Sequence, residues 1–186
     1  MESTEKNMNS FFLRVLRASV VIHFLYSGGA RAERFLTVDE ALRICFPQTA
    51  SFTVETFKLD REAGKATGLK ELRVWTAKQN DQVVGFLLPD RVIGKHEFID
   101  YAVAVSTNGA VLQVEILEYR EHYGTQVRSP KWREQFAGKT AAAPLKLGHD
   151  IYNISGATLS CRHVTEGVKR LLVAFERVVR RVPAPK

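Results

Sequence analysis

The sequence predicts an α+β domain: an antiparallel sheet with flanking helices, closed by a long C-terminal helix. Three observations favour this class. Several short segments have strand-like alternation, hairpin turn signals separate some of them, and one long apolar stripe at helical spacing lies near the C-terminus. The 186 residues are 45% hydrophobic and 25% charged, which excludes a disordered or collagen-like chain.

Residues 1–32 differ from the rest and match the pattern of a secretory signal peptide. A charged start and a short apolar run at residues 18–26 precede small residues that end at Ala32. We expect cleavage there, which leaves a mature domain over residues 33–186 in a periplasmic or other extracytoplasmic location. An uncleaved membrane anchor and a buried helix of the domain are the alternatives.

Charge and cysteine content exclude several classes of function. The net charge of +7 comes without a dense Lys/Arg block, a zinc-finger pattern or an aromatic RNA-binding segment, so nucleic acid is not an expected partner. Cys45 and Cys161 match no metal or haem spacing, and no metal is expected.

The first elements of the domain are a helix and a strand. Thr37 and Glu40 form a capping-box pattern at the start of a helix that ends at Phe46-Pro47. Alternation over residues 52–59 predicts a half-buried strand, and the charged, glycine-containing residues 61–68 predict a loop.

Four further strands follow as two hairpins. Residues 71–77 and 82–88 flank a polar turn, and residues 98–105 and 110–117 flank Asn108-Gly109, a strong hairpin signal.

The last third of the chain contains two predicted helices. Trp132 and Phe136 are four residues apart, so they share one face of a short helix capped by Gly138. The long helix carries its apolar stripe on Val164, Val168, Leu171, Leu172, Phe175, Val178, Val179 and Val182.

Small and hydroxyl residues lead into this long helix, over the segment from Ser155 to Ser160. Unpaired amide groups and the positive end of a helix dipole bind phosphate, Gly156 permits close backbone approach, and hydroxyl groups add donors. An ordinary N-cap is the alternative, and spacing alone favours it, since Ser and Thr begin many helices for structural reasons.

The string Ser155-Gly156-Ala157-Thr158, with Val164-Thr165-Glu166-Gly167-Val168 after it, resembles the FMN-binding domain family. Its members include the G subunit of Rnf complexes and the C subunit of the sodium-pumping NADH:quinone oxidoreductase. Residues 119–124, with Glu121 and Gly124, and residues 135–139 also resemble that family.

The resemblance implies an FMN-binding domain fold and an exported flavoprotein that carries electrons rather than turning over a substrate of its own. FMN would be joined to Thr158 through a phosphoester by a flavin transferase, and the redox partner would be membrane-bound or extracytoplasmic. The implied cofactor-binding residues are Ser155, Gly156, Ala157, Thr158, Glu121, Gly124 and Lys139. A cofactor-free or noncovalent ligand-binding or assembly module on the same fold is the alternative.

The chain departs from the family pattern six residues before Thr158, where an acidic residue is usual and Tyr152 stands here. Three interpretations stay open: the acidic residue is not required, Asp150 substitutes for it, or the chain binds FMN without a covalent bond. Cys161 gives a rival hypothesis, because a thiol in the first turn of a helix has a lowered pKa and can act in redox exchange. A Cys45–Cys161 disulfide is a further possibility in an oxidising compartment.

Overall fold

In the computed structural model, residues 33–49 and 51–180 are described, and the predicted signal peptide at residues 1–32 lies outside them. A six-stranded sheet forms the centre, with every neighbouring pair antiparallel, in the order β1-β6-β5-β4-β3-β2. The strands are β1 (Glu33–Arg34), β2 (Ser51–Lys58), β3 (Glu71–Gln79), β4 (Gln82–Ile93), β5 (Phe98–Val105) and β6 (Val111–Tyr119).

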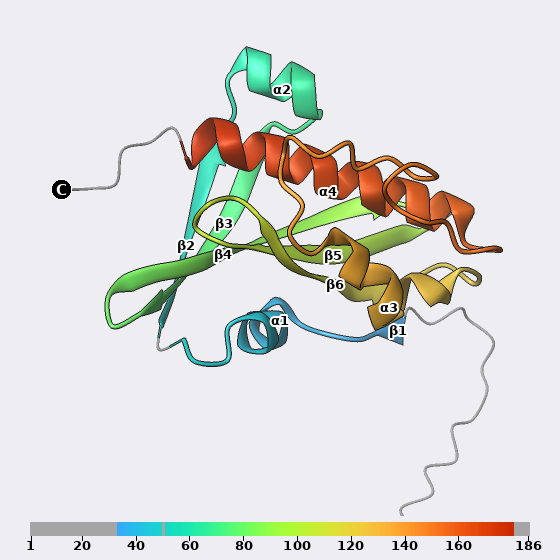
Figure 1. Cartoon of the computed structure of the whole chain (residues 1–186), viewed down its shortest axis with the longest axis horizontal. Coiled ribbons are helices and arrows are strands. Elements are labelled where there is room, and N and C mark those ends of the chain that lie inside the picture. Colours follow the sequence, from blue (N-terminus) through green and yellow to red (C-terminus); the bar gives the residue numbers. More distant parts are fainter. Residues whose placement is uncertain (1–32, 50, 181–186) are drawn as a thin grey trace, which may run out of the picture.

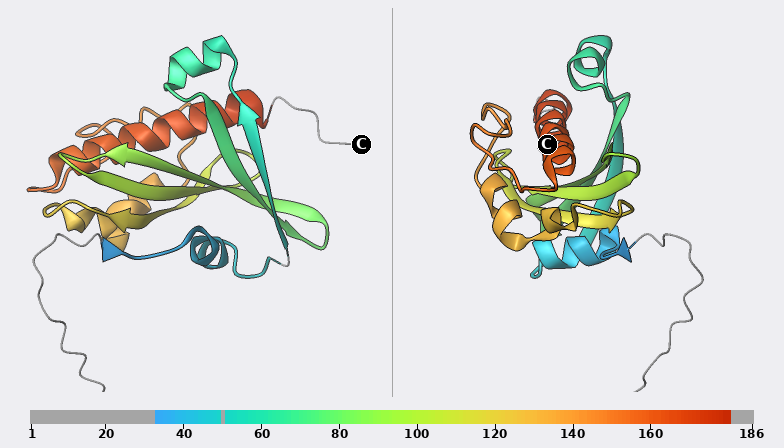
Figure 2. Two further views of the ribbon diagram at one scale, coloured as in Figure 1. Left: turned by 180° about the vertical axis from the view of Figure 1, so that it is seen from behind. Right: turned by 90° about the vertical axis from the view of Figure 1, so that its right-hand side faces the viewer.

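Helices cover both faces of this sheet (Figures 1 and 2). The long helix α4 lies along one face and α1 crosses the other. The helical elements are α1 (Val38–Cys45), α2 (Arg61–Thr67), η1 (Thr125–Arg128), α3 (Pro130–Arg133), η2 (Glu134–Phe136) and α4 (Thr158–Val178). The predicted α+β class with a long C-terminal helix is confirmed.

The capping box of α1 is formed as predicted. The Glu40 amide donates to Thr37 Oγ1 at 3.1 Å, and the Thr37 amide donates to Glu40 Oε2 at 2.6 Å. The helix ends before Phe46, whose amide closes the last turn on Leu42.

Two expectations for the next segment need correction. Strand β2 exists, but it is less buried than predicted: Val54 is 54% exposed, because β2 is an edge strand and α4 covers little of it. Residues 61–67 form α2 rather than a loop. The Asp60 carboxylate caps its first turn by accepting from the Ala63 amide, and Gly68 ends it with φ 72°.

Both predicted hairpins are confirmed, although β4 runs five residues beyond its expected end at Leu88. The residue after Leu88 is Pro89, which lacks an amide hydrogen. The pairing of β4 with β3 extends only to Leu87, so Pro89 has β5 on one side and no β3 partner on the other. A strand tolerates proline at such a free edge.

The predicted helix around Trp132 and Phe136 is divided into α3 and η2. Both rings are buried and pack edge to face with their centroids 5.2 Å apart. The shared face is therefore confirmed. Gly138 lies two residues beyond the end of η2, in the left-handed region at φ 75°.

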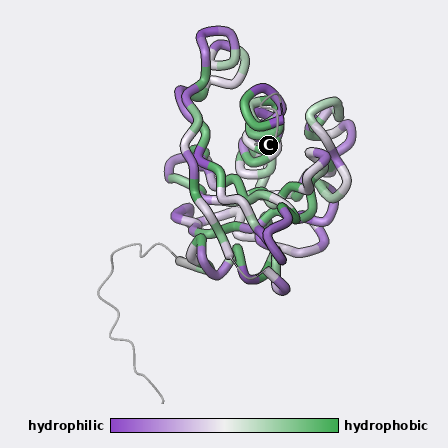
Figure 3. The backbone as a smooth tube through the Cα atoms, turned by 90° about the vertical axis from the view of Figure 1, so that its left-hand side faces the viewer, coloured by the Kyte–Doolittle hydropathy of each residue, from purple (hydrophilic) through white to green (hydrophobic). Residues whose placement is uncertain are grey.

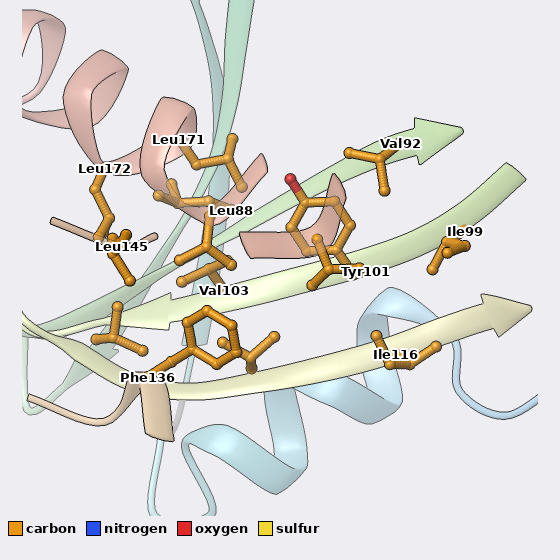
Figure 4. Close-up of a cluster of buried hydrophobic side chains, with 14 of the residues drawn as sticks. Leu88, Val92, Ile99, Tyr101, Val103, Ile116, Phe136, Leu145, Leu171 and Leu172 are labelled. Atoms are coloured by element: carbon orange, nitrogen blue, oxygen red, sulfur yellow. The ribbon is translucent and has the colours of Figure 1, made fainter. Parts of the chain in front are cut away.

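Two hydrophobic clusters lie on opposite faces of the sheet. The larger one joins α4 to the sheet and includes Tyr101, Leu171 and Leu172 (Figure 4). The smaller one lies under α1, where β5 presents only Ala102 and Ala104. Hydrophobic segments gather in the sheet and along α4 (green in Figure 3).

The two clusters also rule out a disulfide between the cysteines. Cys161 belongs to the cluster under α4, whereas Cys45 packs against the cluster under α1, and both thiols are free. The possible Cys45–Cys161 disulfide is therefore wrong, since the sheet separates the two residues.

Gly167 lets α4 lie close to the sheet. A Cβ atom at this position would lie 2.3 Å from Tyr101 Oη and 2.9 Å from Val92 Cγ1. The Tyr101 hydroxyl, which points from β5 toward α4 in Figure 4, donates to Asp90 Oδ2 at 2.8 Å. Arg170 on α4 donates to the same carboxylate at 2.7 and 2.9 Å, so one buried polar network joins helix and sheet.

We predict that Gly167→Ala destabilises the protein by about 1–3 kcal/mol, the usual cost of overpacking a core. Intrinsic helix propensity opposes this loss, since alanine is favoured over glycine by about 1 kcal/mol. Urea unfolding followed by circular dichroism measures the difference. Glu166→Ala, at the exposed neighbouring position, is the control and should stay within about 0.5 kcal/mol of the wild type. A Gly167→Ala protein as stable as the control would contradict the steric argument.

Candidate functional site

The start of α4 is built from a turn and a helix without a side-chain cap. The Ala157 amide donates to the Ile154 carbonyl at 3.0 Å, and Gly156 within this turn has φ 82°, where glycine is favoured. Ala157 is the N-cap residue and has no side-chain acceptor, so Ser155 and Thr158 do not cap the helix. The N-cap interpretation of this motif is therefore wrong. As in any α-helix, the first amide groups of α4 have no carbonyl oxygen within the helix to which they can donate.

A pocket of about 370 Å³ opens beside this helix start. It is lined by three segments that are far apart in sequence: residues 95–96 between β4 and β5, residues 121–123 after β6, and residues 156–160. Its volume is within the range of about 300–1,000 Å³ that is usual for ligand sites. The structure thus brings together the two motifs that the sequence analysis singled out.

The pocket wall carries several exposed basic groups. Lys95, His96 and His122 all line it and are all exposed, whereas its one acidic side chain, Glu121, is engaged in hydrogen bonds to the backbone. Together with the positive end of the α4 dipole, these groups favour an anion. His96 and His122 have no sequence motif of their own, and only the fold shows that they meet.

Glu121 holds the loop between β4 and β5. Its Oε1 accepts from the amides of His96 at 2.5 Å and Glu97 at 3.0 Å. Desolvation raises the pKa of this carboxyl, but the amide hydrogen bonds from Glu97 and His96 outweigh it, so the net shift is downward. Gly94 leaves room for this carboxylate, since a Cβ atom there would lie 2.5 Å from Glu121 Oε1 and would displace the side chain.

His163 fixes the same loop from α4. Its Nδ1 lies 2.6 Å from the Ile93 carbonyl oxygen and 3.1 Å from that of Gly94. Both partners are acceptors, so Nδ1 carries the hydrogen.

Tyr119, the last residue of β6, connects the two motifs. Its hydroxyl donates to the Tyr123 carbonyl at 2.6 Å and lies 3.0 Å from Ser160 Oγ. A phenol has one proton, so Ser160 is the donor in the second bond. Burial raises the pKa of Tyr119 and keeps this phenol protonated. Ser160 is itself buried, and its hydroxyl is therefore not the free donor that the sequence suggested.

Gly124 allows the segment after β6 to lie against α4. Its φ is 86°, and a Cβ atom there would lie 2.7 Å from Tyr119 Oη and 3.3 Å from Ala157 Cβ. The glycine of the Glu-x-x-Gly pattern therefore has a packing role at the junction of the two motifs.

Thr158 is exposed at the first position of α4, and its Oγ1 accepts from Asn153 Nδ2 at 2.9 Å. The sequence analysis missed Asn153, because nothing in a lone asparagine indicates which hydroxyl it will meet. The adjacent Tyr152 is 79% exposed, with its backbone held by Gln135 Oε1 and Trp132 Nε1 at 2.6 and 2.8 Å.

Lys139 and Asp150 lie away from this pocket. Their side chains form an ion pair at 3.0 Å, and the Lys139 carbonyl accepts from the amide of Val111, at the opposite end of β6 from Tyr119. Of the expected cofactor-binding residues, Lys139 is the one that the structure places apart. Gly156, Ala157, Thr158 and Glu121 line the pocket, and Ser155 and Gly124 adjoin it in the chain.

Asp150 organises the loop that leads to Tyr152. Its carboxylate accepts from the amides of Lys146 at 2.7 Å and Leu145 at 3.1 Å as well as from Lys139. Desolvation raises the pKa of Asp150, but these donors together lower it to about 2. The carboxylate is fully engaged in this loop and does not contact Thr158 in place of the acidic residue expected at position 152.

The thiol hypothesis is not supported. Cys161 is fully buried, and burial raises the pKa of its thiol instead of lowering it. Burial also raises the pKa of Cys45 to about 12. Neither sulfur is a thiolate at neutral pH, and a thiolate is the nucleophile in thiol exchange.

Comparison with known proteins agrees with this site. Residues 94–173 match the model of the FMN-binding domain family. The crystal structure of Shewanella oneidensis NqrC superposes with a TM-score of 0.54 at 17% identity, covering 74% of this chain and 85% of that one. No curated protein matches the sequence.

The described residues contain neither a metal-binding cluster nor a membrane-spanning helix. No group of three or more His, Cys, Asp or Glu side chains is arranged to hold a metal ion within residues 33–49 and 51–180. Over the same ranges, no helix is both long and apolar enough to cross a membrane.

We predict that Asp150 makes stability depend on acidity below about pH 4. Its folded pKa of about 2 is below the ordinary 3.8, so its contribution is complete above pH 4 and is lost as the pH falls toward 2. Asp150→Asn should cost about 1–3 kcal/mol at pH 7 and converge with the wild type near pH 2. Thermal unfolding at pH 7, 4 and 2 measures this. Asp81→Asn, at an exposed turn position, should follow the wild-type curve. A constant difference between Asp150→Asn and wild type across this range would refute the assignment.

Proposed function

Residues 94–173 belong to the FMN-binding domain family, and from this premise we propose that the protein is an exported flavoprotein that carries electrons. FMN is the cofactor, and we place its phosphate at Thr158 through a phosphoester. The observation that carries the proposal is the coincidence of the family match with the pocket around Ser155-Gly156-Ala157-Thr158.

The phosphate fits the start of α4 on three counts. The helix has no side-chain cap, so its first amide groups are available to phosphate oxygens. A Cβ atom at Gly156 would meet nothing within 4 Å, so the backbone is open to a ligand there. Lys95, His96 and His122 place basic side chains on the pocket wall.

Thr158 is suited to the ester bond because its hydroxyl is exposed and oriented. Asn153 donates to Oγ1, so the hydrogen of the Thr158 hydroxyl takes no part in that bond and can be removed. In the step that we propose, Oγ1 loses its proton and bonds to the phosphorus of an activated FMN donor, whose leaving group departs as its own bond to phosphorus breaks. A flavin transferase would catalyse this step.

Bound FMN supplies the redox chemistry, and the chain supplies position and environment. Glu121 and His163 hold the loop that forms one wall of the pocket, while Tyr119 joins the other two segments. The pocket is open to the surface, which suits transfer to a second protein. We propose a membrane-bound or extracytoplasmic redox partner, in keeping with export.

We predict that protein exported in the presence of a flavin transferase gains the mass of one FMN minus one water. Thr158→Ala should abolish the gain, because no oxygen remains to form the ester, whereas Thr158→Ser should retain it. Intact-mass spectrometry under denaturing conditions measures all three proteins.

Two other results would revise the proposal. A yellow wild type of unmodified mass that releases FMN on denaturation would indicate noncovalent binding. A colourless protein of unmodified mass would overturn the flavin function and leave a cofactor-free binding or assembly module.

Export has its own test. If residues 1–32 are a cleaved signal peptide, N-terminal sequencing of the exported protein begins at Glu33. A chain that keeps Met1 and is recovered from the membrane fraction would instead support an uncleaved anchor.

A further inference from the structure

Tyr123 is an exposed aromatic residue in the wall of the FMN pocket. Its side chain is 84% exposed, the largest value among the exposed large hydrophobic residues of the described chain. A single exposed tyrosine is ordinary on a protein surface. Tyr152 is nearly as exposed, at 79%, but it does not line the pocket.

The backbone of Tyr123 is fixed, although its ring is free. The buried Tyr119 hydroxyl donates to the Tyr123 carbonyl at 2.6 Å. The next residue, Gly124, is buried close to α4, where the position of its missing Cβ is 3.3 Å from both Ala157 Cβ and Ser160 Oγ. The ring is therefore attached within a few ångströms of the helix start and cannot move away with a flexible loop.

A second partly uncovered apolar side chain lines the same pocket. Leu159 follows Thr158 directly, lines the pocket and is 38% exposed. The pocket thus has a polar end at the first amides of α4 and two apolar side chains next to it. This is the arrangement that a molecule with a phosphate at one end and a flat aromatic ring at the other requires.

We propose that Tyr123 is the stacking platform for the isoalloxazine ring of FMN, with Leu159 bordering the ring. The inference rests on the proposed function, since it takes the phosphate at Thr158 as the anchor. Aromatic rings stack with an offset at centroid separations of about 4.5–7 Å. The phenol ring is electron-rich, so stacking at that distance favours the oxidised flavin ring over the more electron-rich reduced one. The phenol also quenches flavin fluorescence by donating an electron to the excited flavin ring.

The test compares four FMN-loaded proteins: wild type, Tyr123→Leu, Tyr123→Phe and Tyr152→Leu. Tyr152→Leu is the matched control, because it removes an equally exposed tyrosine from outside the pocket. We expect flavin emission to rise several-fold in Tyr123→Leu, with a shift of the reduction potential to a more positive value. Tyr123→Phe should also raise emission, because phenylalanine is a poor electron donor. Its shift in potential should be smaller than that of Tyr123→Leu, because the ring still stacks. Tyr152→Leu should match the wild type in both measurements.

The outcomes separate the inference from the function on which it rests. Unchanged emission and potential in a fully loaded Tyr123→Leu protein would overturn the stacking role and leave the FMN proposal intact. Equal changes in Tyr123→Leu and Tyr152→Leu would overturn it as well, because the effect would not depend on the pocket. Absence of FMN from the wild type, seen by intact mass and absorbance, would overturn both proposals.

Discussion

The close approach of α4 to the sheet at Gly167 is the constraint on which the rest of the structure depends. With the Tyr101 hydroxyl at this point, no side chain larger than glycine fits without movement of the helix or the sheet. Asp90 and Arg170 then fix the rotation of the helix by charged hydrogen bonds around the same hydroxyl. A helix of 21 residues is about 31 Å long and stiff, so fixing it near its middle determines where its first residue lies. Thr158 consequently lies at one end of the sheet, beside the loop after β4 and the residues after β6.

Three side chains at that end of the sheet bind the backbone of neighbouring segments. Glu121 accepts from two amides of the loop, His163 donates to carbonyls at its start, and Tyr119 donates to the carbonyl of Tyr123. Each of these hydrogen bonds fixes a main-chain segment, and none of them involves the exposed side chains of the pocket. The uncapped start of α4 is therefore surrounded by a rigid frame with free polar and apolar side chains on its inner wall.

The sequence predicted the features that depend on local patterns and missed those that depend on distant contacts. Alternation and turn residues placed the strands, and the apolar stripe placed α4, because local propensity and burial agree there. Helix α2 was missed because its capping aspartate at residue 60 precedes a stretch with too few apolar residues to show a period. At the site, Ser155-Gly156-Ala157-Thr158 located the helix start, whereas the roles of Asn153 and His163 follow from contacts that no spacing encodes.

The unusual residue at position 152 can be understood from the same contacts. The backbone at Tyr152 is held on both sides by Trp132 and Gln135, whatever side chain stands there, and that side chain points to solvent. The carboxylate of Asp150 is occupied by the loop that precedes it. Polar support for the Thr158 hydroxyl comes instead from Asn153, one residue later in the chain. A neutral amide orients that oxygen without placing negative charge beside an incoming phosphate, so the loss of an acidic residue at position 152 is compatible with an anion at the start of α4.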